Sequence, residues 1–221
     1  MRARENPFRT SRLDALAYRP RGESIERLLA RWERQGRRGV VVGAHGSGKT
    51  TLLRALAARF TAGGKRVVSW RFSEAQPVPT ARALWSQARR LPPEAVLFVD
   101  GVEQLSAAAR LGLVRAASRA HGWLFTAHDR GSLPVVHETR VDPALLAELV
   151  RTLLGPGARG LGPLLDGLRR RRQDNLREVF LDLYDLASRD DPRILEALER
   201  SSAPPSLTGP PVAPAAMPAS D

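Results

Sequence analysis

Eight consecutive residues carry the strongest chemical signal in this chain of 221 residues. They fit the spacing G-x-x-x-x-G-K-[ST] and read Gly43, Ala44, His45, Gly46, Ser47, Gly48, Lys49 and Thr50. Glycines in such a turn let backbone N–H groups approach phosphate oxygens, which a Cβ would obstruct. The pattern predicts a phosphate-binding loop in which Lys49 reaches the β- and γ-phosphates and Thr50 ligates Mg²⁺. We include Thr51, the next residue, in the predicted nucleotide site.

A second chemical signal is the apolar run 95–99, which ends in an acid, Asp100. A carboxylate at the end of a buried strand can hold Mg²⁺ beside a phosphate loop. ATP hydrolysis also needs a carboxylate that orients the attacking water, and the residue after Asp100 is a glycine. Glu103 is therefore the first candidate for that role, although it could simply cap the helix that follows. Glu74, after the preceding strand, is the alternative.

The hydrophobic pattern predicts how these residues are positioned. Apolar runs alternate with amphipathic stretches, which indicates strands near 39–42, 66–72, 95–100, 123–126 and 135–141 with helices between them. Such alternation is typical of an α/β fold with right-handed crossovers. We expect a three-layer P-loop NTPase core with a five-stranded, mainly parallel sheet. The phosphate loop then joins the first strand to the helix that begins near Lys49.

The pattern changes after Val141 and becomes helical only. Asp142-Pro143 is a typical helix start, and three further helical patterns follow. The sequence predicts a core at 1–141 with an N-terminal helix, a small all-helical lid at 142–200, and a disordered Pro/Ala-rich tail at 201–221.

The two acids and the loop together resemble a known family. A phosphate loop followed by a hydrophobic strand, Asp100, Gly101 and Glu103 is similar to the STAND class of P-loop ATPases, especially its NACHT-like members. It departs from that pattern at Gln104, where a second acid is common. The stretches Asn6-Pro7-Phe8 and 18–23 show a weaker resemblance to ExeA-like and origin-recognition-like AAA+ ATPases, in which such segments pack against adenine.

The resemblance implies two more nucleotide contacts. The strand 123–128 looks like the sensor 1 strand of AAA+ proteins, which places Thr126 near the γ-phosphate and His128 where many relatives carry arginine. Arg177 occupies a place similar to sensor 2, near the start of a late lid helix. The same stretch, Asn175 to Glu178, is also an ordinary helix-capping pattern.

Composition and net charge indicate which partners and which location to expect. The net charge is +12, yet only two of the 35 basic residues are lysines, which leaves 33 arginines. This skew is typical of GC-rich codon usage spread over the whole surface, so nucleic acid stays an alternative partner that we do not favour. The chain has no cysteine, no apolar run of membrane-spanning length and no secretory leader, which predicts a cytoplasmic protein.

We therefore expect a protein that binds ATP and Mg²⁺, hydrolyses ATP, and acts as a nucleotide-dependent conformational switch on an unknown protein partner. Lys49 and Glu103 are the expected catalytic residues. Two alternatives stay open: a nucleic-acid-associated helper ATPase, and a kinase built on the same loop. A GTPase is disfavoured because the chain lacks the Asn-Lys-x-Asp motif that reads guanine.

Overall fold

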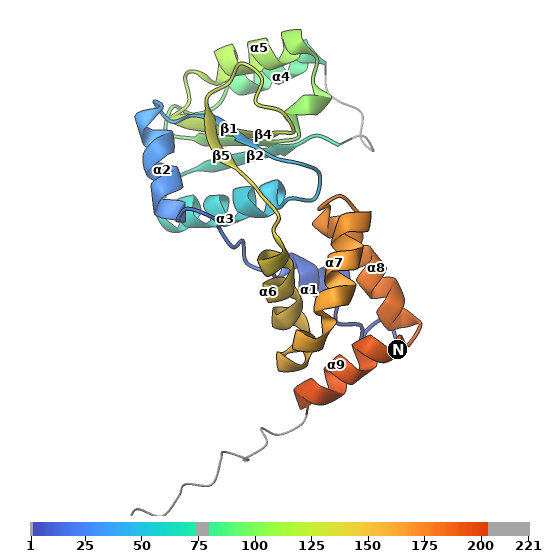
Figure 1. Cartoon of the computed structure of the whole chain (residues 1–221). Coiled ribbons are helices and arrows are strands. Elements are labelled where there is room, and N and C mark those ends of the chain that lie inside the picture. The colour runs from blue at the N-terminus through green and yellow to red at the C-terminus, as the bar shows by residue number, and fades with distance from the viewer. Residues whose placement is uncertain (1, 74–79, 203–221) are drawn as a thin grey trace, which may run out of the picture.

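The computed structural model describes residues 2–73 and 80–202. In chain order the elements are α1 Thr10–Asp14, α2 Ile25–Arg34, β1 Arg38–Val42, α3 Lys49–Ala62, β2 Val67–Arg71, α4 Ala81–Arg89, β3 Val96–Asp100, the 3₁₀ turn η1 Val102–Gln104, α5 Ala107–Ala117, β4 Gly122–Ala127, β5 Val135–Glu138, α6 Pro143–Leu154, η2 Pro156–Leu161, α7 Gly162–Arg171, α8 Leu176–Ser188 and α9 Pro192–Ser202. The chain forms a sheet unit and a helical unit (Figure 1).

The sheet unit confirms the predicted α/β fold. Its strands lie in the order β2-β3-β4-β1-β5, and all neighbouring pairs are parallel. The expectation of a mainly parallel sheet therefore understates the regularity among the described strands. The fifth strand ends at Glu138, three residues earlier than the sequence pattern predicts. The carboxyl ends of β1, β3 and β4 meet at one edge, where parallel α/β sheets bind their ligands.

Helices cover both faces of the sheet. Leu97 and Val99 of β3 pack in one cluster with α4 and α5, whereas Val96 and Phe98 pack in another with α2 and α3. Because side chains alternate along a strand, a strand covered on both faces must be apolar throughout. The run 95–99 meets that requirement, with all five residues buried.

The helical unit has its own hydrophobic core. Leucines and other apolar residues of α6, α7, α8 and α9 form one cluster, centred on fully buried residues such as Val150, Val179 and Leu183. The first helix of the unit, α6, follows Asp142, whose side chain accepts a hydrogen bond from the Leu145 N–H at 2.6 Å, and Pro143 occupies the first turn. Residues 201 and 202 end α9, and the rest of the predicted tail, 203–221, lies outside the described residues.

The N-terminal segment joins the helical unit. Phe8 is 1% exposed within the helical cluster, with its ring 6.3 Å from that of Phe180. The Asn6 amide donates to the Tyr184 carbonyl at 2.9 Å and to the Ser188 hydroxyl at 3.0 Å. The sequence pattern placed these residues in the core at 1–141, and their resemblance to AAA+ segments implied packing against adenine. Their contacts show that Asn6 and Phe8 instead tie the chain start to α8, a long-range pairing that no local pattern encodes.

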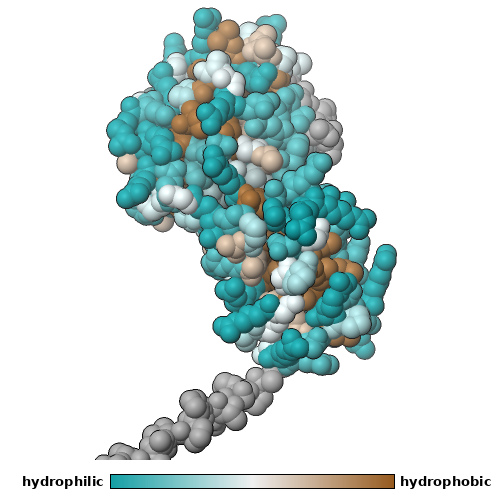
Figure 2. Space-filling model, in the orientation of Figure 1, coloured by the Kyte–Doolittle hydropathy of each residue, from teal (hydrophilic) through white to brown (hydrophobic). Residues whose placement is uncertain are grey.

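The face seen in Figure 2 is mostly hydrophilic, and its hydrophobic residues form small separate patches. Among the described residues, Leu111 and Leu181 are the exposed large hydrophobic side chains. Within the described ranges, no helix has both the length and the apolar character that crossing a membrane requires.

Candidate nucleotide-binding site

The phosphate loop lies between the end of β1 and the start of α3. Gly46 and Gly48 adopt positive φ angles of 69° and 95°, a conformation that favours glycine over every other residue. Gly48 is also the N-cap of α3, so the unpaired N–H groups of the first helical turn begin directly after the loop. A helix start of this kind attracts phosphate oxygens.

Two hydroxyl groups brace the loop, one from within the motif and one from outside it. The Ser47 hydroxyl lies 2.7 Å from the Ala44 carbonyl and 2.6 Å from the Thr139 hydroxyl. Thr139 in turn donates to the Val42 carbonyl at 3.2 Å and follows directly after β5. The sequence analysis missed Thr139. Its only signal is its place just beyond the carboxyl end of a strand.

Lys49 points back into its own loop. Its ammonium group donates to the carbonyls of Gly43 at 2.6 Å and Ala44 at 2.8 Å, and the residue is 8% exposed. Burial lowers the pKa of Lys49, whereas the nearby Glu103 and Asp100 carboxylates oppose that shift. A phosphate oxygen beside this ammonium would offer a charged acceptor in place of a neutral carbonyl, which makes a stronger hydrogen bond.

Asp100 gathers the polar groups at the end of β3. Its two carboxylate oxygens accept hydrogen bonds from the hydroxyls of Thr50 at 2.8 Å and Thr126 at 2.7 Å. Arg71 of β2 forms an ion pair with the same carboxylate at 3.2 Å, a contact that the sequence analysis did not anticipate. The Thr50 hydroxyl and the Asp100 carboxylate are adjacent oxygen donors of the kind that Mg²⁺ prefers. These two residues therefore suit the expected metal.

Thr126 also fixes the turn after β3. Its hydroxyl accepts a hydrogen bond from the Gly101 N–H at 2.9 Å while it donates to Asp100. Gly101 has a φ of 85°, and a Cβ at this position would overlap the Phe72 carbonyl. The residue after Asp100 must therefore be small, and the turn carries the chain on into η1 and Glu103.

Glu103 and two histidines line the side of the site next to Lys49. The His128 Nε2 atom lies 3.2 Å from a Glu103 carboxylate oxygen, and the His128 and His45 rings have centroids 3.7 Å apart. The second Glu103 oxygen is buried without a hydrogen-bond partner among the described residues. Burial lowers the pKa of His128, which favours a neutral ring beside Glu103. Glu74, the alternative acid, lies outside the described residues.

The start of α8 rests on the phosphate loop. A Cβ placed on Gly46 would overlap the Asn175 side-chain oxygen and would lie 3.1 Å from the Arg177 backbone nitrogen. Asn175 caps α8, because its oxygen accepts from the N–H groups of Arg177 at 3.1 Å and Glu178 at 3.4 Å. The capping role weighed in the sequence analysis is thus real. The same geometry brings the exposed Arg177 beside the loop, as a sensor role would require.

A polar chain leads away from the other side of the loop. The Tyr18 ring packs near Gly48, and its hydroxyl lies 3.0 Å from the His137 Nε2 atom. The other ring nitrogen of His137 lies 2.7 Å from Glu23. Burial, followed by the Glu23 charge, raises the pKa of Tyr18 to about 12. Of the two N-terminal stretches compared with adenine-binding segments, the one at 18–23 therefore lies at the loop.

Comparisons with known proteins agree with this geometry. The family described as novel STAND NTPase 5 matches residues 17–131, which is slightly more than half of the chain. No curated protein sequence matches the chain. Among solved structures, one described as the crystal structure of a DNA replication initiation factor is similar in fold, with a TM-score of 0.52 and 17% sequence identity. The similarity covers 79% of this chain and 62% of that chain.

Proposed function

The chain belongs to the novel STAND NTPase 5 family, and we propose that it binds Mg-ATP in the phosphate loop, hydrolyses it, and changes the position of its helical unit with nucleotide state. The observation that carries this proposal is the convergence of Lys49, Thr50, Asp100 and Thr126 at one edge of the parallel sheet. The start of α3, just after β1, supplies the Lys49 ammonium and the Thr50 hydroxyl. The ends of β3 and β4 supply the Asp100 carboxylate and the Thr126 hydroxyl, and both hydroxyls donate hydrogen bonds to that carboxylate.

In the proposed reaction each side chain has one task. Lys49 leaves the Gly43 and Ala44 carbonyls and donates to the β- and γ-phosphates. Thr50 and Asp100 hold Mg²⁺, which would neutralise phosphate charge when bound. Glu103 orients the attacking water. Its buried oxygen, which has no hydrogen-bond partner among the described residues, is suited to accept a hydrogen bond from that water. His128 keeps the Glu103 carboxylate in place through the 3.2 Å contact.

The switch follows from the contact between α8 and the loop. Gly46 lies against Asn175, so phosphate entering the loop competes for space with the first residues of α8. We propose that nucleotide shifts α8 and that Arg177, exposed beside the loop, then contacts the γ-phosphate. The helical unit moves with α8 because they share one hydrophobic core. In this proposal the helical unit, with the N-terminal segment that packs on it, is a lid.

Titration calorimetry with adenine nucleotides tests the proposed binding mode. Mg-ATP is expected to bind at one site per chain. AMP is expected to bind at least about 10-fold more weakly, because it lacks the phosphates that Lys49 contacts through charge-assisted hydrogen bonds. Release of phosphate from ATP by the same preparation is the matching test of hydrolysis. Equal affinity for ATP and AMP would show that the loop does not hold the phosphates.

A further inference from the structure

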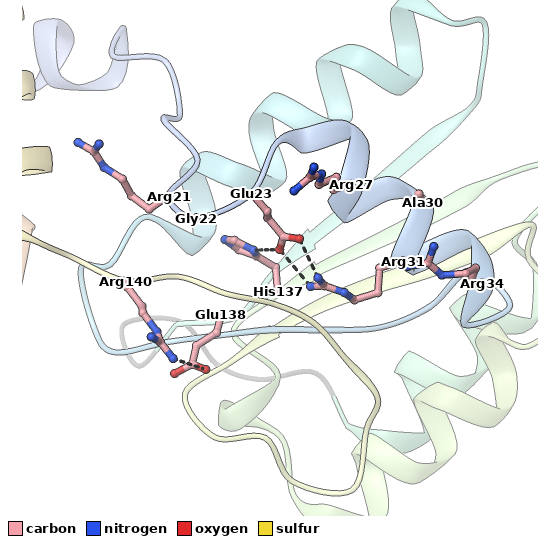
Figure 3. A pocket seen from close by; sticks show the side chains of 10 residues that line it. All are labelled: Arg21, Gly22, Glu23, Arg27, Ala30, Arg31, Arg34, His137, Glu138 and Arg140. Carbon is pink, nitrogen blue, oxygen red and sulfur yellow. Dashed lines mark hydrogen bonds and ion pairs between the residues drawn. The ribbon is translucent and has the colours of Figure 1, made fainter.

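An open groove runs along α2 on the edge of the sheet unit, apart from the phosphate loop (Figure 3). Its volume is about 610 Å³, and half of its ten lining residues are arginines: Arg21, Arg27, Arg31, Arg34 and Arg140. Two glutamates offset only part of this charge, and no residue of the phosphate loop lines the groove. The groove is therefore a cationic site outside the phosphate loop, although His137 and Glu23 connect it to Tyr18 beside that loop.

Two of the arginines are held in fixed positions. Arg31 donates to both oxygens of Glu23, at 3.0 and 2.8 Å, and to the Val136 carbonyl at 2.7 Å. Arg21 donates to Glu148 at 2.8 Å. Their charges are paired, so these side chains give the groove its shape. A groove that is already shaped loses less conformational entropy when a ligand binds.

The other three arginines supply charge that is either unpaired among the described residues or, for Arg140, only weakly paired. Arg27 and Arg34 are exposed and contact no acidic group among the described residues, and Arg140 is 76% exposed with one weak contact to Glu138 at 3.4 Å. Arg27 and Arg34 lie two turns apart on α2, which separates them by about 10 Å along the helix axis. That separation lets the two guanidinium groups contact different phosphates of one nucleic-acid strand, which carries one charge per nucleotide.

The walls of the groove disfavour a peptide ligand. β5 is an edge strand, but the Val135 and Val136 carbonyls that it presents to α2 already accept hydrogen bonds from Gln35 at 3.2 Å and from Arg31. A peptide that paired here as an added strand would therefore compete with these side chains for the two carbonyls. Ala30 is the one aliphatic side chain in the lining, so an apolar anchor, which most peptide interfaces depend on, has no pocket here.

We propose that this groove binds the phosphodiester backbone of a nucleic acid, without regard to base sequence. Guanidinium groups pair with phosphate oxygens through two parallel hydrogen bonds. Arg27 and Arg34 have no acidic partner among the described residues, and Arg140 would exchange its weak contact with Glu138 for a phosphate. The lining has no phenylalanine, tyrosine or tryptophan on which bases could stack, so recognition is limited to the backbone. This proposal does not depend on ATP binding or hydrolysis.

Fluorescence anisotropy with a labelled single-stranded DNA, its duplex and the equivalent RNA tests the groove, with EDTA present and no nucleotide. The double variant Arg27→Gln/Arg34→Gln is compared with Arg110→Gln/Arg115→Gln, which removes the same charge from exposed positions of α5 on the opposite face of the sheet. The groove variant is expected to bind single strands roughly 10-fold more weakly near 100 mM salt, with a salt slope shallower by about 1.4. The α5 variant is expected to bind as wild type does.

The proposal would be overturned if the wild-type protein bound no nucleic acid, or if both variants lost equal affinity, which would assign the binding to arginine content in general. It would also be overturned if poly-glutamate of matched charge displaced DNA at lower concentration, which would assign the groove to an acidic peptide. Thermal unfolding of each variant checks that it is folded. Calorimetry with Mg-ATP on the same samples separates a failed groove from a failed phosphate loop, because neither pair of arginines lies in that loop.

Discussion

Glu103→Gln is expected to lower ATP turnover by about 10²–10⁴-fold while ATP affinity stays close to that of wild type. The amide has the size of the carboxylate and can still contact His128, but it is a far weaker acceptor for the proton of the attacking water. The change removes help that is given only in the transition state, so turnover falls and binding does not. The buried oxygen of Glu103, free among the described residues, is the structural basis for this expectation.

Steady-state phosphate release and calorimetry, measured on the same protein, check this result. Glu94→Gln is the matched control, because Glu94 is exposed in the turn before β3 and has no place in the proposed site. Glu74→Gln tests the alternative acid. If Glu74→Gln is inactive and Glu103→Gln is not, water is activated from the segment after β2, and the role proposed for Glu103 is wrong.

Lys49→Ala is expected to weaken ATP binding by roughly 10–150-fold, because a charge-assisted hydrogen bond to phosphate contributes about 1.5–3 kcal/mol. The loss should be larger for ATP than for AMP, which lacks both phosphates that Lys49 reaches. Turnover at saturating ATP should fall as well, since the same charge stabilises the transferring phosphoryl group.

Calorimetric titration checks the Lys49 prediction, and the chain offers a matched control. Lys65 is the one other lysine and is exposed in the turn before β2. Lys65→Ala removes the same charge from outside the site and should leave ATP affinity unchanged. An affinity for Lys49→Ala equal to that of wild type would exclude the phosphate loop as the place where ATP binds.

The fold was predictable because its signals are local. A buried parallel strand must be apolar on both faces, so a run such as 95–99 can be recognised as a strand from its own residues alone. The phosphate loop can also be recognised locally from its glycines, because Gly46 and Gly48 adopt φ angles that other residues avoid. Alternation of strands and helices then implied the parallel sheet, whose carboxyl edge brings Asp100 and Thr50 together.

The contacts that the sequence did not predict join segments far apart in the chain. Thr139 braces Ser47 across 92 residues, and Asn175 reaches Gly46 from another unit. No sequence pattern indicates which residue an isolated threonine after a strand will contact. The same holds for an asparagine that also caps a helix. Phe8 is a similar case, because a lone aromatic residue does not reveal which of two hydrophobic cores it joins.

The structure separates arginines that have an acidic partner from arginines that have none, a distinction that composition cannot make. In the basic run 169–172, Arg169 pairs with Asp174 at 2.5 Å and Arg172 pairs with Asp182 at 2.5 Å, so half of that run stabilises the helical unit itself. The arginines of the groove at α2 differ, because Arg27 and Arg34 have no acidic partner among the described residues. Charge density along the sequence does not separate these two cases.

A distance measurement tests most directly the proposal that nucleotide in the phosphate loop moves the helical unit. The chain has no cysteine, so Ala58→Cys on α3 and Leu181→Cys on α8, both exposed positions, create two unique labelling sites. Double electron–electron resonance should give one distance distribution without nucleotide and a shifted one with Mg-ATP. The shift should vanish when Lys49→Ala is added at the same ATP concentration. Identical distributions with and without ATP, under conditions where calorimetry shows the site to be filled, would contradict the switch.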